Sequence, residues 1–203
     1  DNVVDDSKKD EYLEAIQRKT GRMNELITLL FDYVRLGSEG FKLNKEKIDI
    51  CELVREVAAS EYSDVEDDGM QMEVDIPEKV CFVEADKIQL SRVITNLITN
   101  ARRHNAKGTD IGIFVVIDDD IRIFVADNGQ AIPEEKVETL FDPFVMGDKS
   151  RNSKGGSGLG LSIVKKIVDM HGFRIRLVQK PEIRKYRVAE NYSKTFMIMI
   201  PID

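Results

Sequence analysis

Three glycines at alternate positions carry the strongest chemical signal in this chain. Gly156, Gly158 and Gly160 lie in the run K-G-G-S-G-L-G-L-S, residues 154–162, directly before a helical pattern. Glycine reaches positive φ without strain, so such a backbone can turn several N–H groups toward one anion. The N-terminal end of the following helix adds partial positive charge. The run therefore predicts a polyphosphate site, with a flexible glycine-rich loop as the alternative.

Two common phosphate-binding motifs do not fit this run. A P-loop needs Lys and Ser or Thr after its last glycine, whereas Lys154 precedes the glycines. A dinucleotide fingerprint needs G-x-G-x-x-G after a strand, but counted from Gly156 the third glycine comes one residue early. The identity of the ligand therefore depends on the motifs that accompany the glycines.

A second set of polar side chains lies on a predicted amphipathic helix over residues 86–104. Asn96 and Asn100 are one helical turn apart and share a face, and Arg103 follows three residues later. Asparagine is a poor helix former, so two on one face of an otherwise apolar helix are unusual. An amide oxygen is a hard ligand that suits Mg²⁺. The helix therefore carries a candidate metal ligand, unless both amides simply face solvent.

Two further motifs lie on predicted loops. The run D-N-G at 127–129 follows a predicted strand over 121–126. It is either a common turn or a carboxylate that accepts from an exocyclic amine, with Gly129 letting the backbone approach a flat ring. The run F-D-P-F at 141–144 opens a loop that ends in the glycines, and we expect both phenylalanine rings to anchor that loop by packing.

The order of these motifs resembles one protein family. The chain reads N-x-x-x-N, D-x-G, F-x-P-F, G-x-G-x-G-L and then Lys194-Thr195-Phe196. This series closely resembles the ATP-binding domain of sensor histidine kinases, part of a superfamily with DNA gyrase and the heat-shock chaperone ATPases. The resemblance covers nearly the whole chain and implies ATP and Mg²⁺ as cofactors. It also implies a Bergerat-type α+β fold, a two-layer sandwich in which helices cover one face of a mixed sheet.

The resemblance implies roles along the predicted helix 86–104. Asn100 would help to hold Mg²⁺, Asn96 would sit beside it toward the phosphates, and Arg103 would contact a phosphate. His104 matches a position that lies against the adenine. Gyrase-like members carry Glu where Asn96 stands. Because Asn cannot take a proton, the site favours phosphoryl transfer over ATP hydrolysis.

The other positions implied at the nucleotide belong to the base pocket and the loop. Asp127 would accept from the adenine amine, with Thr195 nearby, and the glycines would wrap the phosphates. Ala131 stands where the family usually has glycine, so a slightly tighter base pocket is expected. The full set comprises Asp127, Gly129, Ala131, Ile132, Phe144, Gly156, Ser157, Gly158, Leu159, Gly160 and Thr195.

A heptad pattern over residues 7–36 predicts a long helix with an apolar face. Such a face favours a four-helix bundle with a second copy of the chain, unless the helix packs on the rest of its own chain. The helix resembles the second helix of the family's dimerisation and phosphoacceptor domain. We therefore expect that partial domain over residues 1–38 and the catalytic ATP-binding domain over 39–203.

The family's phosphoacceptor box, H-E/D-x-x-[TN]-P, does not occur, and neither His104 nor His171 has its context. We expect the acceptor histidine on an upstream helix, an isolated chain unable to autophosphorylate, and a response regulator as the later partner. His171 is expected to be a structural residue near a helix end. Two alternatives stay open: a regulatory nucleotide-binding module without kinase activity, and a gyrase-like ATP hydrolase.

Composition and charge indicate the kind of partner and the cellular compartment to expect. The net charge of −7 over 203 residues argues against a nucleic-acid surface. Cys51 and Cys81 are far apart, which suggests buried thiols in a reducing compartment. No apolar run approaches the roughly 20 residues that span a bilayer, and the chain does not start with Met. We expect a cytoplasmic piece of a longer bacterial inner-membrane sensor, with no direct membrane contact of its own.

The remaining patterns predict the supporting elements. They indicate a helix over about 50–62, a solvated acidic loop at 64–68 and a strand over 70–76. A hairpin is expected over 111–126 and a polar loop over 179–193. Helices packed on one face of a mixed sheet form an α+β, two-layer arrangement.

Overall fold

The structure is a computed structural model, in which residues 6–145 and 157–202 are described. Within them the helices are α1 (Asp6–Leu36), α2 (Ile50–Asp67), α3 (Lys87–His104), α4 (Glu134–Val137) and α5 (Gly160–His171). The strands are β1 (Glu46–Asp49), β2 (Gln71–Asp75), β3 (Phe82–Ala85), β4 (Asp110–Ile117), β5 (Asp120–Asp127), β6 (Arg174–Gln179) and β7 (Lys194–Pro201). Two short 3₁₀ helices, η2 (Glu182–Lys185) and η3 (Arg187–Ala189), lie between β6 and β7.

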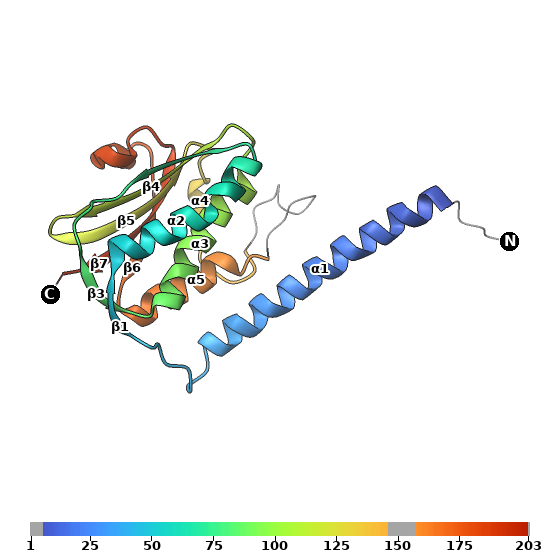
Figure 1. Cartoon of the computed structure of the whole chain (residues 1–203), viewed down its shortest axis with the longest axis horizontal. Coiled ribbons are helices and arrows are strands. Elements are labelled where there is room, and N and C mark those ends of the chain that lie inside the picture. The colour runs from blue at the N-terminus through green and yellow to red at the C-terminus, as the bar shows by residue number, and fades with distance from the viewer. Residues whose placement is uncertain (1–5, 146–156, 203) are drawn as a thin grey trace.

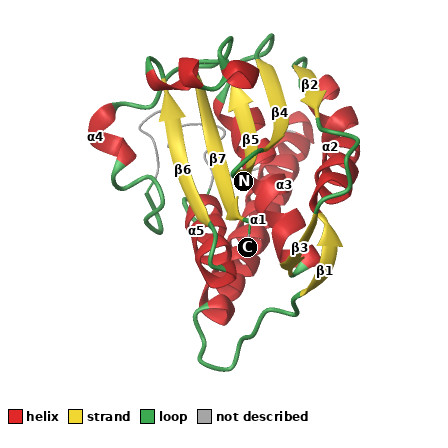
Figure 2. Ribbon diagram, turned by 90° about the vertical axis from the view of Figure 1, so that its left-hand side faces the viewer, coloured by secondary structure: helices red, strands yellow, loops and turns green. Residues whose placement is uncertain are grey.

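A mixed five-stranded sheet forms the centre of the domain, in the order β2-β4-β5-β7-β6. β2 runs parallel to β4, and the other neighbours are antiparallel. Helices α2, α3 and α5 lie against one face of this sheet, while β1 and β3 form a separate antiparallel ribbon at its edge (Figures 1 and 2). The α+β architecture expected from the sequence is confirmed.

The main core lies between these helices and the sheet. In β5 the side chains of Ile121, Ile123 and Val125 alternate with residues that face the other side, as a strand requires. They meet the apolar stripe of α3, whose members are at most 4% exposed: Leu90, Val93, Ile94, Leu97, Ile98 and Ala101. Burial of this stripe fixes the rotation of α3 about its own axis, and with it the direction of its polar face.

The segment 179–193, predicted as a polar loop, instead covers part of the opposite face of the sheet. Its buried residues Ile183, Ala189 and Tyr192 pack in a second core against Phe114 of β4 and Phe124 of β5. The Tyr192 and Phe114 rings meet edge to face, with centroids 5.6 Å apart. The prediction was wrong because these few apolar residues follow neither helical nor strand spacing, yet each reaches the sheet.

The acidic run 64–68 was predicted to be a solvated loop. That prediction was wrong, because α2 continues to Asp67. Arg102 of α3 lies between its carboxylates: the guanidinium contacts Asp68 at 2.8 Å, Asp64 at 2.8 Å and Glu61 at 3.4 Å. Burial raises the pKa of Glu61, and the positive charge of Arg102 acts in the opposite direction. One buried cation therefore offsets the repulsion that would otherwise unwind the last turns of α2.

Helix α1 leaves the domain, and its contacts with the described residues of the domain lie near its own C-terminal end (Figure 1). Leu36 is buried, Asp32 pairs with Arg92 of α3 at 2.6 Å, and the Lys166 ammonium of α5 lies 4.6 Å from the Tyr33 ring centre. The apolar residues along the rest of α1 are exposed: Tyr12, Leu13, Ile16, Met23, Leu26, Ile27, Leu30, Phe31 and Val34. The alternative that α1 packs along its own chain is therefore wrong for most of its length.

No helix in the described part of the chain has the length and apolar character that a bilayer-spanning segment requires. The expected domain boundary at residue 38 and the expected dimer both stay predictions.

His171 joins α5 to the start of α3, which agrees with the structural role expected for it. Its Nδ1 donates to the Ile167 carbonyl at 2.8 Å, and its Nε2 accepts from the backbone N–H of Asp86 at 3.0 Å. Asp86 in turn caps α3, because its Oδ1 accepts from the Gln89 N–H at 3.0 Å. This pattern requires the neutral imidazole with its proton on Nδ1.

Replacement of Arg102 by Met should leave three neighbouring carboxylates without their cation. Because the arginine side chain is only 17% exposed, we expect the free energy of unfolding to fall by about 1–3 kcal/mol, less at high salt. Urea unfolding at two salt concentrations measures this. The matched control is Arg184→Met, on an exposed arginine of η2, which should change stability little. Equal losses in both variants would contradict the role given to Arg102.

Protonation of His171 should destabilise the fold in mild acid. Burial lowers the pKa of His171 from its ordinary 6.5, so the unfolded chain takes up this proton first. Its contribution to stability is complete above about pH 6.5 and is lost as the pH falls through the lower folded pKa. Urea titrations at several pH values from about 7.5 to 5 measure this. The free energy of unfolding should fall less steeply with pH in His171→Gln than in the wild-type chain. A decline as steep in His171→Gln as in the wild-type chain would contradict the assignment.

Candidate nucleotide-binding site

Helix α3 places Asn96 against the beginning of α5. The Asn96 Nδ2 donates to the Arg92 carbonyl at 2.9 Å, one turn back on the same helix. Its Oδ1 then faces the start of α5, where it would lie 3.6 Å from a Cβ placed on Gly160. Asn100 is half-buried one turn further along the same face. The structure therefore brings Asn96 and Gly160 together, two positions that are far apart in the sequence.

In the described part of the chain, the N-terminal end of α5 offers backbone N–H groups to an anion. Leu159 precedes the helix without a side-chain cap, and no acidic residue occupies the first turn. The Leu159 N–H donates to Ser157 Oγ at 3.1 Å. The next N–H groups of the helix have no carbonyl one turn earlier to pair with, and the helix dipole adds positive character there.

The two described ends of the loop between α4 and α5 are joined by their backbones. The Phe144 N–H donates to the Gly158 carbonyl at 2.8 Å. Gly158 has φ +69°, and a Cβ there would lie 2.8 Å from the Phe144 carbonyl carbon, so only glycine fits. The predicted residue Gly156 and the centre of this loop lie outside the described residues.

Only one of the two phenylalanines anchors this loop by packing. Phe141 meets Phe196 of β7 edge to face at 6.2 Å, as expected. Phe144 is 62% exposed and has a φ of 63°, so the expectation that its ring packs was wrong. Its backbone contact with Gly158 holds the loop instead, which side-chain patterns do not reveal.

Asp127 forms the buried end of the site, where β5 ends. Its Oδ1 accepts from Lys194 Nζ at 2.5 Å and from the Gly129 N–H at 3.0 Å. Lys194 Nζ also donates to the Gln130 carbonyl at 2.8 Å. The sequence reading gave no role to Lys194; the only sequence signal was its place at the start of the last strand, and the register of β7 opposite Asp127 supplies the partner.

His104 lies at the same end of the site. Its pKa is lowered, first because the surrounding groups remove it from water and then because Lys194 and Arg103 are positive, while Asp127 acts in the opposite direction. Helix α3 thus extends from Asn96, beside α5, to His104, beside the Asp127 pair. Eight residues of helix span about 12 Å, enough for an adenosine and its phosphates laid along this face.

Two other predicted residues border the same end. Gln179 of β6 clamps the backbone of Ile132, accepting from its N–H at 2.7 Å and donating to its carbonyl at 2.9 Å. Ala131 is exposed, so its methyl group, in place of the usual glycine hydrogen, meets little resistance in the described residues.

Thr195 is not brought to the other predicted residues. Neighbouring side chains of a strand point to opposite faces, and Lys194 and Phe196 both lie on the helix-covered face. Thr195 therefore points, like Met197, toward the second core on the far face. Thr195 was expected near the adenine side of the site, whereas its neighbour Lys194 is the residue that lies beside Asp127.

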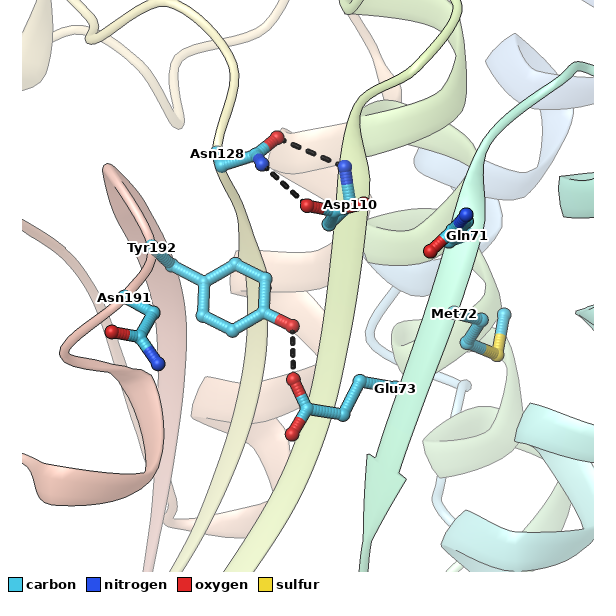
Figure 3. Close-up of a pocket in the computed structure, with 7 residues that line it drawn as sticks. All are labelled: Gln71, Met72, Glu73, Asp110, Asn128, Asn191 and Tyr192. Carbon is cyan, nitrogen blue, oxygen red and sulfur yellow. Dashed lines mark hydrogen bonds between the residues drawn. The ribbon is translucent and has the colours of Figure 1, made fainter.

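A separate hollow of about 320 Å³ lies on the far face of the sheet, lined by Gln71, Met72, Glu73, Asp110, Asn128, Asn191 and Tyr192 (Figure 3). The Asn128 amide pairs with Asp110: its Oδ1 accepts from the backbone N–H at 2.9 Å, and its Nδ2 donates to the carboxylate at 2.7 Å. The Tyr192 hydroxyl donates to Glu73 at 2.7 Å, and burial and this carboxylate raise the tyrosine pKa. Four of the lining residues thus bond one another in two pairs, and none of the seven belongs to the predicted nucleotide site.

Within residues 6–145 and 157–202, no cluster of three or more His, Cys, Asp or Glu side chains could hold a metal ion. Asn100 offers one amide oxygen on the polar face of α3, a ligand type that suits Mg²⁺, which keeps waters and binds substrate phosphates.

A side chain at Gly129 should disturb the Asp127 turn. A Cβ there would lie 1.8 Å from Asn105 Oδ1, and the bond from Asn105 Nδ2 to the Ala101 carbonyl, 2.8 Å, holds that amide in place. We expect Gly129→Ala to lower the free energy of unfolding by about 1–3 kcal/mol, as for other overpacked sites.

Urea unfolding measures this effect. Adding Asn105→Ala to Gly129→Ala should recover part of the loss, because it removes the clashing amide. Gly40→Ala is the control, since a Cβ at that glycine meets nothing within 4 Å. No recovery in the double variant would show that the clash is not the cause.

Comparisons with known proteins identify the family of the chain. Residues 85–203 match the family described as histidine kinase-, DNA gyrase B- and HSP90-like ATPase. The chain is 30% identical over 183 residues to sensor histidine kinase YcbM of Bacillus subtilis (strain 168), covering 89% of this chain and 59% of that protein. It is 32% identical over 169 residues to sensor protein kinase WalK of Staphylococcus aureus, covering 81% of this chain and 40% of that protein.

Solved structures extend the likeness to the fold. The nucleotide-free catalytic domain of histidine kinase ThkA matches with a TM-score of 0.64 at 28% identity, covering 78% of this chain and 96% of that chain. ThkA in complex with response regulator protein TrrA matches in fold over 98% of this chain and 53% of that chain, with a TM-score of 0.73 at 24% identity. This chain therefore belongs to the histidine kinase-, DNA gyrase B- and HSP90-like ATPases, as a sensor histidine kinase catalytic domain preceded by a long helix.

Proposed function

We propose that this chain binds Mg-ATP and presents the γ-phosphoryl group to a histidine on an upstream helix of a longer sensor histidine kinase. The phosphoryl group would later pass to an aspartate of a response regulator. The observation that carries the proposal is the convergence of the buried Asp127 pair, the amides of α3 and the open start of α5. The relatives' names support the same activity.

The base end of the proposed site would hold adenine. The carboxylate of Asp127 would accept from the exocyclic amine, and Gly129 and Ile132 would border the ring. His104 would lie against the base, and its lowered pKa favours the neutral imidazole.

The phosphate end of the proposed site would lie between α3 and α5. The N–H groups at the start of α5, with Ser157, Gly158, Leu159 and Gly160, would bind phosphate oxygens. Gly156 keeps its predicted place in the same loop. Arg103 would add positive charge from α3. Asn100 would be a ligand of Mg²⁺, which when bound neutralises charge on the phosphates.

The phosphoryl group would be held for transfer rather than given to water. Asn96 faces the start of α5, and an amide cannot take a proton from a water molecule. This favours the kinase over a gyrase-like hydrolase. A nucleotide-binding module without kinase activity is the second candidate, favoured by Ala131 in place of the family's glycine.

The proposed partners follow from the same histidine kinase function. The ThkA complex with response regulator TrrA supports a receiver domain as a partner of this chain as well. The exposed apolar face of α1 supports a homodimer in the longer protein. The relatives named as sensor kinases support a place for this domain on the cytoplasmic side of a bacterial membrane.

Loss of the Asp127 charge should weaken nucleotide binding. A hydrogen bond to a charged group contributes about 1.5–3 kcal/mol, so Asp127→Asn should raise the Kd for ADP roughly ten- to hundredfold. Titration calorimetry measures this. Asn128→Ala is the matched control, because the neighbouring Asn128 amide bonds Asp110 on the far face of the sheet and should leave the Kd nearly unchanged. Unchanged ADP affinity in Asp127→Asn would show that the base pocket is misassigned.

A phosphoryl-transfer assay distinguishes the kinase from the regulatory nucleotide-binding module and from the ATP hydrolase. This chain, mixed with a separate acceptor-helix fragment and γ-labelled ATP, should label the acceptor histidine. Tight ATP binding without transfer would support the regulatory module, and steady phosphate release by the chain alone would support the hydrolase.

A further inference from the structure

The pairing of Lys194 with Asp127 raises a question about the base pocket. Lys194 opens β7 directly opposite Asp127, the last residue of β5. Both side chains are almost fully buried, with exposed fractions of 6% and 4%. A lysine therefore lies beside the one carboxylate that the proposed function assigns to the base.

The pair keeps hydrogen-bonding capacity for a ligand. Lys194 Nζ donates to Asp127 Oδ1 and to the Gln130 carbonyl, at 2.5 and 2.8 Å. An ammonium has three N–H groups, so one is left over. Asp127 Oδ1 takes both the lysine and the Gly129 N–H, and no bond to Oδ2 occurs within residues 6–145 and 157–202. One donor and one acceptor thus remain on adjacent groups.

Lys194 should stay in place when a ligand arrives. Removing one member of a buried ion pair leaves the other charged and unpaired, which is strongly unfavourable. A ligand that bonds Oδ2 does not need the oxygen that the lysine occupies. The ligand therefore meets the carboxylate and the ammonium together.

We propose that Lys194 is a base-contacting residue that donates its third N–H to N1 of adenine, while Asp127 Oδ2 accepts from the exocyclic amine. This inference rests on the proposed nucleotide function. Adenine presents an acceptor, N1, directly beside a donor, the 6-amino group, which matches the pair. In guanine the 6-position is a carbonyl oxygen, which would face the carboxylate. The lysine therefore helps to select adenine over guanine.

The test compares ADP with 1-deaza-ADP, in which N1 is a C–H group. The wild-type chain should bind 1-deaza-ADP roughly ten- to hundredfold more weakly than ADP, because the buried ammonium loses its acceptor. This measurement needs no variant and does not depend on how a variant folds. Lys194→Met should bind ADP more weakly and show nearly equal Kd values for the two nucleotides. Lys185→Met, at an exposed lysine of η2, should behave as wild type.

Each outcome decides the proposal. Equal affinities of the wild type for ADP and 1-deaza-ADP would overturn the contact with N1 and leave the proposed function standing. Tighter ADP binding by Lys194→Met would also overturn it, since the lysine would then compete with the base. Absence of ADP binding by the wild-type chain would overturn the proposed function and this contact together.

Discussion

Burial of the apolar stripe of α3 is the constraint on which the rest of the structure depends. Six residues of that stripe are at most 4% exposed, so the helix can take only one rotation on the sheet. That rotation turns Asn96 toward the start of α5, with Asn100 one turn further along the same face, and brings His104 to the end of β5. The contacts at both ends of α3, Asp86 with His171 and Arg102 with the acidic end of α2, fix the helix along its axis. The polar face of α3 is thus positioned by apolar packing of the opposite face and by polar contacts at both ends of the helix.

Electrostatics divides the site into two ends with different tasks. At the start of α5 the positive character comes from backbone N–H groups in a first turn that holds no acidic residue, which suits phosphate. At the end of β5 the charges are already paired, because Lys194 neutralises Asp127 before any ligand arrives. Binding at that end therefore depends on the fit of donors and acceptors rather than on net charge. This division suits a ligand that has a neutral base at one end and a charged phosphate chain at the other.

The sequence predicted those parts of the fold that depend on local patterns, and missed those that depend on register and distant contacts. The apolar period of α3 and the order of motifs were sufficient for the architecture. A strand shifted by one residue turns every side chain to the other face, so Thr195 and Lys194 could not be told apart without the register of β7. The end of α2 depends on Arg102, and the cover formed by 179–193 depends on single residues such as Ile183. Neither feature could be predicted from the residues of its own segment.

The run D-N-G joins the two faces of the sheet at one turn. Asp127 faces the helices and pairs with Lys194, whereas Asn128 is bonded twice to Asp110 at the start of β4. The Ser193 N–H also donates to the Asp127 carbonyl, so the cover on the far face ends at the same residue. The carboxylate at the base end is therefore held by the bonds of its own side chain and by its backbone. A pocket that must distinguish purines by single hydrogen bonds needs such a rigid acceptor, and the second core supplies that rigidity from the face opposite the ligand.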